Sequence, residues 1–321
     1  GADIEVKYFD HEYCHVACAA VTSGFQEAAV ISVDGWGEKY FSRAYKLLNG
    51  KLSLVSDSQT AEAFRLSDSR VVLYSIGSMY EYFTDMLGFT PGSDEGKVEA
   101  LAAYGRPVED LLSELISGTH VKDLTISFDR KKILAALNVA RFERLLKTEG
   151  REALAATIQK YLELIMEKYV RAVSEHTRSK NIALAGGVAA NVINSLRLYE
   201  KIAENIHITP AMADDGSAQG AAYAYLLENG WSIEKIRSLT PEMPYFSTSY
   251  SRNEILRSIE RRGPQINHTD LGEQWPEKVA EMVAEGKIGA IFHGKMEWGP
   301  RALGNRSIIA DARRKTSETD K

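Results

Sequence analysis

The stretch AAVISVDGWGEKYFSRAYKLLNGKLSLVSD, residues 28–57, decides the fold class. Its first seven residues form an almost unbroken apolar run with β-branched members, which predicts a buried strand. Two further strands are expected at 39–48 and 51–57, because the Asn49-Gly50 pair between them is the strongest short-range signal for a β-hairpin. The sequence therefore predicts a sheet that opens with a buried strand and an antiparallel hairpin.

Parallel strands are expected further along, where a strand followed by a helix occurs twice. NIALAGG (181–187) precedes a helix to about 203, and NIHITP (205–210) precedes SAQGAAYAYLLENG (217–230). Such repeats imply parallel strands with crossover helices. Together with the hairpin, they predict an α/β fold, an actin-like ATPase (ASKHA, ribonuclease-H-like) duplicated domain.

The remaining segments are expected to be mostly helical. A short strand at 4–9 precedes a helix that Asp10 caps and Gly24 ends. Further helices are predicted at 69–89, 95–105, 107–117, 130–147 and 151–178.

Three domain segments are predicted. Residues 1–240 would form the actin-like domain, and 241–270 a linker, which overlaps the Pro-containing stretch 231–268 that is predicted to be irregular. Residues 271–321 would begin another α/β domain, with a helix at 275–285 and a strand at 287–293.

Composition narrows the class of partner. A net charge of -5 argues against a broad nucleic-acid or anionic membrane surface, and no apolar run approaches the roughly 20 residues of a membrane span. Two cysteines, Cys14 and Cys18, make no disulfide framework, so a cytoplasmic location fits best. Whether the chain forms a homodimer stays open.

A metal constellation is suggested by histidines and aspartates. His11 and His15 are one helical turn apart, which places both imidazoles on one face, although HxxxH spacing also arises by chance. Asp34 ends the buried strand before a Gly-x-Gly turn, and Asp214 and Asp215 end another strand. Such a set suits iron or another first-row transition metal better than Mg²⁺. Cys14 and Cys18 share the helix face but are read as small core residues.

Three glycine-containing loops are candidates for phosphate or nucleotide binding. Gly186 and Gly187 precede a helix expected from about residue 188, so their N–H groups could approach phosphate, although close strand packing needs glycine equally often. Asn191, one turn into that helix, could reach a ribose or phosphate oxygen.

The second loop, residues 90–105, contains Asp94, Glu95 and Lys97, which could handle phosphate, metal or substrate, or form a capping cluster. The third, GKMEWGPRALGNRS (294–307), is predicted to receive an anion through Lys295, Arg301, Asn305 and Arg306.

These motifs together resemble the O-carbamoyltransferases of nodulation-factor and antibiotic biosynthesis, the NodU/CmcH family. The resemblance runs in order through DHEYCHVACA, VISVDGWGE, GSDEGKVEALAAYG, LAGGVAAN, PAMADDGSAQGAA and GKMEWGPRALGNRSIIAD. It implies an actin-like domain similar to the tRNA threonylcarbamoyltransferase subunit, followed by a YrdC-like domain that makes carbamoyladenylate from carbamoyl phosphate and ATP.

The resemblance also implies roles for single residues. His11, His15, Asp34 and Asp214 would hold the metal, and Asp214 is preferred over Asp215 because the family places its ligand two residues before the glycine. Gly186, Gly187 and Asn191 would hold nucleotide in the first domain, and Lys295, Arg301, Asn305 and Arg306 would bind phosphate or adenylate in the second. Apart from the resemblance, the loop of residues 90–105 makes Asp94, Glu95 and Lys97 the candidate catalytic residues, and Mg²⁺ is a further candidate ion.

The implied reaction is carbamoyl transfer to a hydroxyl of a small-molecule acceptor. Family members start upstream of this chain and continue past its last motif, so we expect both ends to be incomplete. The alternatives are threonylcarbamoyl transfer to tRNA, a kinase of the same superfold, and a non-catalytic metal- or nucleotide-binding module.

Overall fold

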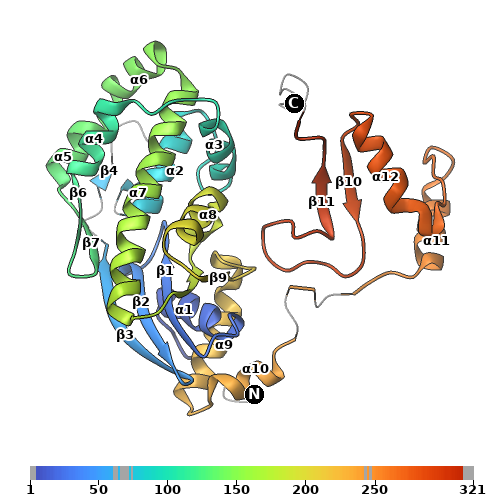
Figure 1. The fold of residues 1–321 in the computed structure, drawn as a ribbon, viewed down its shortest axis with the longest axis horizontal. Helices are drawn as coiled ribbons and strands as arrows, with labels where there is room; N and C mark the ends of the chain where they lie inside the picture. Colours follow the sequence, from blue (N-terminus) through green and yellow to red (C-terminus); the bar gives the residue numbers. More distant parts are fainter. Residues whose placement is uncertain are drawn as a thin grey trace. The chain divides into compact units, whose positions relative to one another are not determined.

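The computed structural model describes residues 5–60, 64–65, 72–73, 75–241, 244–245 and 248–313. They form two compact units, residues 1–240 and residues 241–321 (Figure 1). Neither is placed relative to the other, so each is described by itself.

A five-stranded sheet in the first unit confirms the predicted fold class. Its strand order is β3-β2-β1-β8-β9. The strands are β1 (Glu27–Val33), β2 (Tyr40–Leu48), β3 (Lys51–Gln59), β8 (Asn181–Ala185) and β9 (Asn205–Ile208). β1 pairs antiparallel with β2 and parallel with β8, so the hairpin and the crossover meet at this strand. The described residues contain one sheet of this kind.

The hairpin between β2 and β3 follows from its two turn residues. Asn49 and Gly50 both have positive φ, 50° and 71°, as a two-residue type I′ turn requires. That turn matches the right-handed twist of the strands, so it fixes the register that places Leu48 opposite Lys51.

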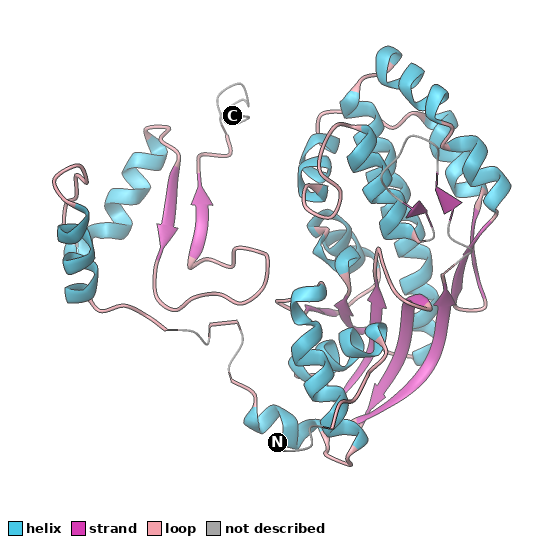
Figure 2. Ribbon diagram, turned by 180° about the vertical axis from the view of Figure 1, so that it is seen from behind, coloured by secondary structure: helices cyan, strands magenta, loops and turns pink. Residues whose placement is uncertain are grey.

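Two layers of helix cover the sheet, which explains the apolar run of β1. Ala29, Ile31 and Val33 pack in one cluster with the long helix α7 (Arg151–Thr177). The alternate residues Ala28 and Val30 pack in a second cluster with α1 (His11–Thr22). Both faces of the strand are therefore buried, as in parallel sheets generally. Figure 2 shows helices on both faces of the sheet.

The remaining elements of the first unit are short. They are β4 (Phe64–Arg65), β5 (Val72–Leu73), α2 (Ile76–Met86), α3 (Glu95–Ala102), α4 (Glu109–Ser117), β6 (Thr119–Lys122), β7 (Thr125–Phe128), α5 (Arg130–Ala136), α6 (Val139–Thr148), α8 (Val192–Lys201), α9 (Ser217–Glu228) and α10 (Ile233–Leu239). None of the helices in the described part of the chain is long and apolar enough to cross a membrane.

Several local predictions differ from the structure. The helix expected at 69–89 is shorter, because β5 lies at Val72–Leu73 and α2 begins at Ile76. The helix expected at 130–147 is two helices, because Asn138 accepts a hydrogen bond from the N–H of Arg141 and starts α6. The β6–β7 hairpin was not predicted, since its turn uses Asp123 and Leu124 at positive φ rather than glycine. Residues 5–9 are irregular instead of a strand, and residue 4 lies outside the described residues. The stretch 231–268 contains helices instead of being irregular, α10 and α11.

The second unit has little interior. It consists of α11 (Arg252–Arg262), α12 (Trp275–Ala284) and the antiparallel pair β10 (Gly289–Phe292) and β11 (Arg306–Ile309). No described residue of this unit is buried. Its large apolar side chains, Phe292 and Ile308 among them, face solvent.

Candidate metal centre

Helix α1 presents two histidines on one face. Its N-terminus is fixed by Asp10, whose Oδ1 accepts hydrogen bonds from the N–H of Tyr13 at 2.9 Å and from Arg43 Nη1 at 3.0 Å. One turn separates His11 from His15, so their Nε2 atoms lie 3.1 Å apart. By fixing where α1 starts, the cap also fixes the positions of both imidazoles.

Two aspartates reach the same point from other elements. Asp34 directly follows β1, and its Oδ1 accepts a hydrogen bond from the N–H of Gly35 at 2.6 Å. Asp214 begins the 3₁₀ turn Asp214–Gly216 that follows β9 and leads into α9. Because β1 and β9 are parallel members of one sheet, their carboxyl ends lie along the same edge.

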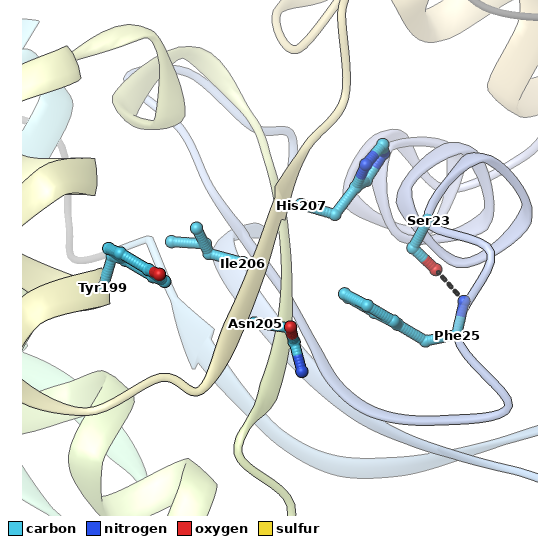
Figure 3. A pocket seen from close by; sticks show the side chains of 6 residues that line it. All are labelled: Ser23, Phe25, Tyr199, Asn205, Ile206 and His207. Carbon is cyan, nitrogen blue, oxygen red and sulfur yellow. Dashed lines mark hydrogen bonds between the residues drawn. The ribbon is translucent and has the colours of Figure 1, made fainter.

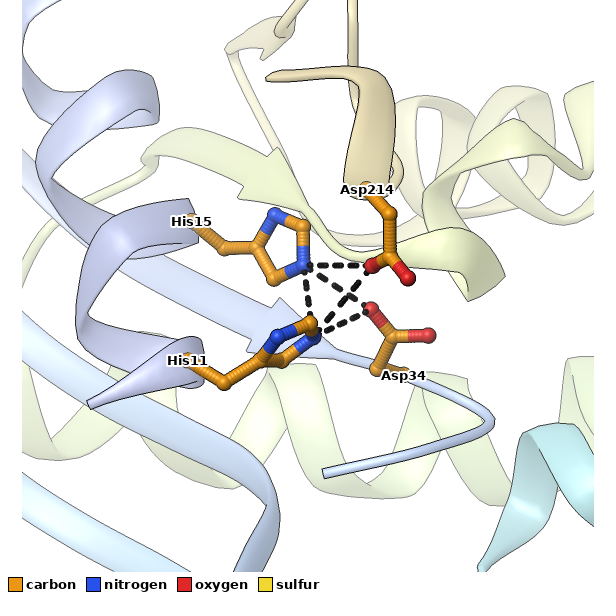
Figure 4. A group of neighbouring side chains, drawn as sticks. All are labelled: His11, His15, Asp34 and Asp214. Atoms are coloured by element: carbon orange, nitrogen blue, oxygen red, sulfur yellow. Dashed lines mark hydrogen bonds and ion pairs between the residues drawn. The ribbon is translucent and has the colours of Figure 1, made fainter. Parts of the chain in front are cut away.

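The four side chains converge on one point (Figure 4). Histidine Nε2 atoms and one oxygen of each aspartate lie within 4.8 Å of one another, and Asp215 is not in this group. The five closest donor distances range from 2.9 to 3.6 Å. Two donors that each lie ~2.1 Å from one ion are about 3.0 Å apart at a right angle and about 3.4 Å at the tetrahedral angle. Five of the six spacings are therefore compatible with four ligands around one ion.

Burial distinguishes the two sides of this cluster. The side chains of His15 and Asp34 are 1% and 10% exposed, whereas those of His11 and Asp214 are 22% and 72% exposed. The centre is therefore closed on the side of β1 and open on the side of Asp214, which leaves an approach for a substrate oxygen.

The charges of the cluster are strongly coupled. Burial lowers the pKa of His15, but the carboxylates of Asp214 and Asp34 outweigh burial and raise it to about 10. The hydrogen bond to Asp34 raises the pKa of His11. Burial likewise raises the pKa of Asp34, but the two imidazoles outweigh it and hold that pKa well below its usual range. A cation at this point would replace the protons that otherwise compensate the carboxylates.

The donor set fits a transition-metal ion. Asp34 Oδ2 is buried, and it lies 2.9 Å from His15 Nε2 and 3.5 Å from His11 Nε2. A buried carboxylate oxygen needs a compensating positive charge, which protonated imidazoles or a metal cation would supply. Two imidazoles with two carboxylates suit Fe, Mn or Zn. Cys14 and Cys18 are buried free thiols whose pKa burial raises, to about 11 and about 12, so they belong to the core.

Glutamate 12 is a site residue that our sequence reasoning missed. With the two histidines it forms HExxH, a helical motif in which the glutamate commonly serves as a base beside a metal. Here Glu12 is buried and accepts a short hydrogen bond from Ser32 of β1, which ties it into the core. Burial raises its pKa to about 7. The motif signal was present, but its usual role does not apply.

Glutamate 81 is a second missed residue, and no sequence pattern indicates it. It lies on α2, and a Cβ on Gly35 would come within 2.7 Å of its Oε1. Gly77 allows this approach, because a Cβ there would lie 2.4 Å from the Gly35 Cα. Burial, then Glu95 and Asp34, raise the pKa of Glu81 to about 7. No hydrogen bond or ion pair of Glu81 with another described residue is found, so its carboxyl group is open to a ligand.

The glycine loop after β8 adjoins the metal centre. Gly186 has φ +87°, and a Cβ there would lie 2.3 Å from the carbonyl oxygen of Val33. A Cβ on Gly187 would lie 3.0 Å from Asp34 Oδ1. Close packing against β1 thus accounts for both glycines, and a nucleotide contact stays a prediction.

Asparagine 191 bonds to α7 and α8 inside the protein, and its predicted nucleotide contact stays a prediction. Its Oδ1 accepts the N–H of Asn194 at 2.8 Å, which caps α8. Its amide also exchanges hydrogen bonds of 2.8 and 3.1 Å with the buried amide of Gln159. These bonds hold the side chain inside the protein.

The charged residues of the loop before α3 bond within that loop, although the Asp94 side chain makes no capping hydrogen bond to the helix. Asp94 accepts hydrogen bonds from Lys97 Nζ at 2.8 Å and from the N–H of Thr90 at 3.1 Å, and the Lys97 contact lowers its pKa. Glu95 accepts the N–H of Gly92 at 2.7 Å. The structure therefore pairs these predicted catalytic residues with one another and with their own loop.

Arg306, Asn305 and Glu297 of the cation-rich loop in the second unit also bond within the loop and its flanking strands, although Arg306 Nε has no hydrogen-bond partner among the described residues. Arg306 lies 3.5 Å from the ring centroid of Phe292, and its Nη1 donates to the carbonyl oxygen of His293 at 2.6 Å. Glu297 Oε1 accepts the N–H groups of Leu303 and Asn305 at 2.9 and 2.7 Å. The chain's own carboxylate thus fills an anion position of this loop. The predicted phosphate contacts of Lys295, Arg301, Asn305 and Arg306 stay predictions.

Comparisons with known proteins identify the family. The family described as Carbamoyltransferase N-terminus matches residues 3–223, and that described as Carbamoyltransferase C-terminus matches residues 280–320. An uncharacterised protein of Methanocaldococcus jannaschii is 39% identical over 96% of this chain and 52% of its own length. Nodulation protein NolNO of Sinorhizobium fredii is 30% identical over 98% of this chain and 44% of its own length. The chain thus spans about half the length of the curated relatives it matches.

Among solved structures, the chain resembles full-length HypF in its phosphate- and nucleotide-bound form. The two are 15% identical with a TM-score of 0.49, over 70% of this chain and 44% of that one. Nothing about ligands follows from a likeness at that level. The sequence families and relatives are sufficient: the chain belongs to the carbamoyltransferase family.

Proposed function

We propose that this chain is the metal-holding core of an enzyme that transfers a carbamoyl group to a hydroxyl of a small-molecule acceptor. The observation that carries this proposal is the convergence of His11, His15, Asp34 and Asp214 at donor distances of 2.9 to 3.6 Å. Family membership indicates the type of reaction, carbamoyl transfer, and the four-residue cluster indicates where in the chain that reaction would occur.

The four residues would hold one ion of iron or another first-row transition metal. When bound, such an ion supplies Lewis acidity towards a carbonyl, phosphoryl or hydroxyl oxygen. The imidazoles must be neutral at Nε2 to bind it, and the carboxylates of Asp34 and Asp214 keep the net charge of the site low. Substrate would enter from the side of His11 and Asp214, which are the more exposed pair.

Glu81 would accept a hydrogen bond from the acceptor hydroxyl. Its carboxyl group rests against Gly35, one residue after Asp34, and is partly exposed. A base with a pKa near 7 is suited to receive the hydroxyl proton while the oxygen bonds to the carbamoyl carbon. In this proposal Glu81 on α2 accepts the proton, whereas Asp34 after β1 helps to hold the metal ion that orients the carbamoyl donor.

The carbamoyl donor would be carbamoyladenylate, made from carbamoyl phosphate and ATP. Carbamoyl phosphate acylates a neutral alcohol poorly, whereas a mixed anhydride with AMP offers a large leaving group that a site can position. We place the nucleotide beside Gly186 and Gly187, whose loop adjoins Asp34. For the second unit we propose that Lys295 and Arg301 bind phosphate or adenylate.

A transfer assay with preformed carbamoyladenylate tests this function. The metal-loaded chain would be given a panel of hydroxylated acceptors, and carbamate esters measured by mass spectrometry. His15→Ala should abolish product, whereas the exposed His120→Ala should not. Equal product from both variants, or none from the wild type with any acceptor, would contradict the proposal.

A further inference from the structure

The outer edge of the sheet is an unpaired strand. In the described residues β9 pairs only with β8. The N–H groups of Asn205 and Thr209 donate towards β8, to Lys180 and Leu184. Backbone groups alternate along a strand, so those of Ile206 and Ile208 point outward, and no other described residue hydrogen bonds to them.

A groove follows this edge. It has a volume of about 480 Å³ and is lined by Ser23, Phe25, Tyr199, Asn205, Ile206 and His207. Figure 3 shows Tyr199 and Ile206 on one side of the strand, with Phe25 and His207 on the other. A groove that straddles a free strand edge fits an extended backbone, whose amides pair with the strand.

This edge lacks the usual protection against pairing. Edge strands commonly carry lysine, proline or a bulge, but β9 reads Asn-Ile-His-Ile. Thr22 Oγ1 donates to the carbonyl oxygen of Cys18, so His207 Nε2 must be the donor in its 2.9 Å bond to Thr22. Burial, then Arg237, lower the pKa of His207 to about 4, so it is neutral. Two such strands can approach without charge repulsion.

An exposed apolar face lies beside the groove on α8. Val192, Ile193, Leu196 and Tyr199 are 54%, 45%, 53% and 50% exposed. Their spacing puts them on one helix face, and Tyr199 also lines the groove. Contiguous apolar side chains of this kind typically mark an interaction site.

We propose that a second copy of this chain binds here about a two-fold axis. A partner must offer both an open strand edge and an apolar helix beside it. The chain itself has both features next to each other, so two copies related by a two-fold axis match one another. Antiparallel pairing would place Ile206 of one copy opposite Ile208 of the other, with the axis at His207. The two β9 strands join the sheets, and the α8 faces pack together.

The expected dimer is weak. The strand edge has four residues, and only four large side chains are half exposed beside it, which is less than the ~800 Å² per partner of a standard interface. We therefore expect a dissociation constant on the order of 1 to 100 μM.

Sedimentation equilibrium of the 321-residue chain tests the proposal. The weight-average mass should rise with concentration from 35.6 kDa towards twice that value. Leu196→Glu charges the helix face, and Ile206→Pro removes an outward N–H without breaking the β8 ladder. Each should weaken dimerisation at least tenfold. Leu54→Glu, on the opposite edge strand at 50% exposure, is the matched control and should dimerise normally.

Three outcomes would overturn the proposal. A wild-type chain that stays monomeric at 100 μM has no such interface. A dimer unaffected by Leu196→Glu and Ile206→Pro, both folded by circular dichroism, forms through another surface, such as the apolar side chains of the second unit. A dimer that Leu54→Glu weakens equally is paired through β3.

Discussion

The metal cluster and the cation-rich loop were both predicted as charged sites, but the two units hold them in different ways. Each donor of the metal cluster is carried by α1 or by a segment that leaves the buried sheet, and Asp34 Oδ2 lies close to both imidazoles. In the loop of residues 294–307, no described residue is buried, and Glu297 and Arg306 bond to nearby backbone, although Arg306 Nε has no hydrogen-bond partner in the described part of the chain. A packed scaffold can bring charged side chains from separate elements together, whereas an open loop bonds most of its charged groups to its own backbone.

Hydrogen exchange should show the largest difference between the two units. Amides of β1 and α7 are buried within the core, whereas those of β10 and α12 are carried by a unit without buried residues. We expect exchange in the second unit to be faster by on the order of a thousandfold. Exchange measured by mass spectrometry with comparable protection in both units would contradict this contrast.

Gly187→Val should weaken metal binding by about 10- to 100-fold. Its Cβ would lie 3.0 Å from Asp34 Oδ1, so the valine must move a ligand. Gly289→Val is the matched control in the second unit, because the nearest atom to its Cβ is 3.7 Å away. Isothermal titration with Mn²⁺ or Zn²⁺ would measure both affinities. An unchanged affinity in a folded Gly187→Val chain would show that the glycine loop and the metal centre are independent.

Glu12→Gln should change how stability depends on pH in the metal-free chain. The folded-state pKa of Glu12 is raised from 4.5 to about 7. The proton that Glu12 holds in the folded state therefore adds to the free energy of unfolding below pH 4.5, and this stabilisation is lost as the pH rises through 7. A glutamine side chain does not titrate, so the variant should gain on the order of 2 kcal/mol over the wild type between pH 5 and pH 8.5. Urea unfolding at the two pH values would measure this difference. Parallel shifts in both proteins would show that Glu12 does not titrate in this range.

The smallest effects are expected in the loop of the second unit. Glu297→Ala removes the carboxylate that accepts hydrogen bonds from the N–H groups of Leu303 and Asn305. These N–H groups would then be available to phosphate, so phosphate binding should strengthen by a few-fold, about 1 kcal/mol or less. Arg306→Ala should weaken it by a similar factor, because that guanidinium already bonds to backbone carbonyls. Phosphate titrations followed by NMR would compare them. A loss of more than tenfold in Arg306→Ala would mean that the loop is preorganised for an anion.

The sequence predicted the sheet and the pairing of His11 with His15 because both depend on local signals. A few neighbouring residues are enough to predict the local geometry in three places: the apolar run of β1, the Asn49-Gly50 turn and the HxxxH spacing. Glu81 had no such signal, since its place beside Gly35 depends on how α2 packs through Gly77. The bonds between Asn191 and Gln159 had no such signal either, because the two residues are 32 positions apart in sequence. Contacts that arise only from packing were therefore the ones that sequence reasoning missed.

Metal stoichiometry in ligand variants tests the central claim most directly. Purified chain reconstituted with Fe²⁺ or Mn²⁺ and desalted would be measured by elemental mass spectrometry, together with His15→Ala and Asp34→Asn. His120→Ala and Asp123→Asn, both at exposed positions of the β6–β7 hairpin, serve as controls. We predict one ion per chain in the wild type and the controls, and less than a tenth of an ion in the two ligand variants, by a loss on the order of 100-fold in affinity. Full occupancy in folded His15→Ala and Asp34→Asn would contradict the account.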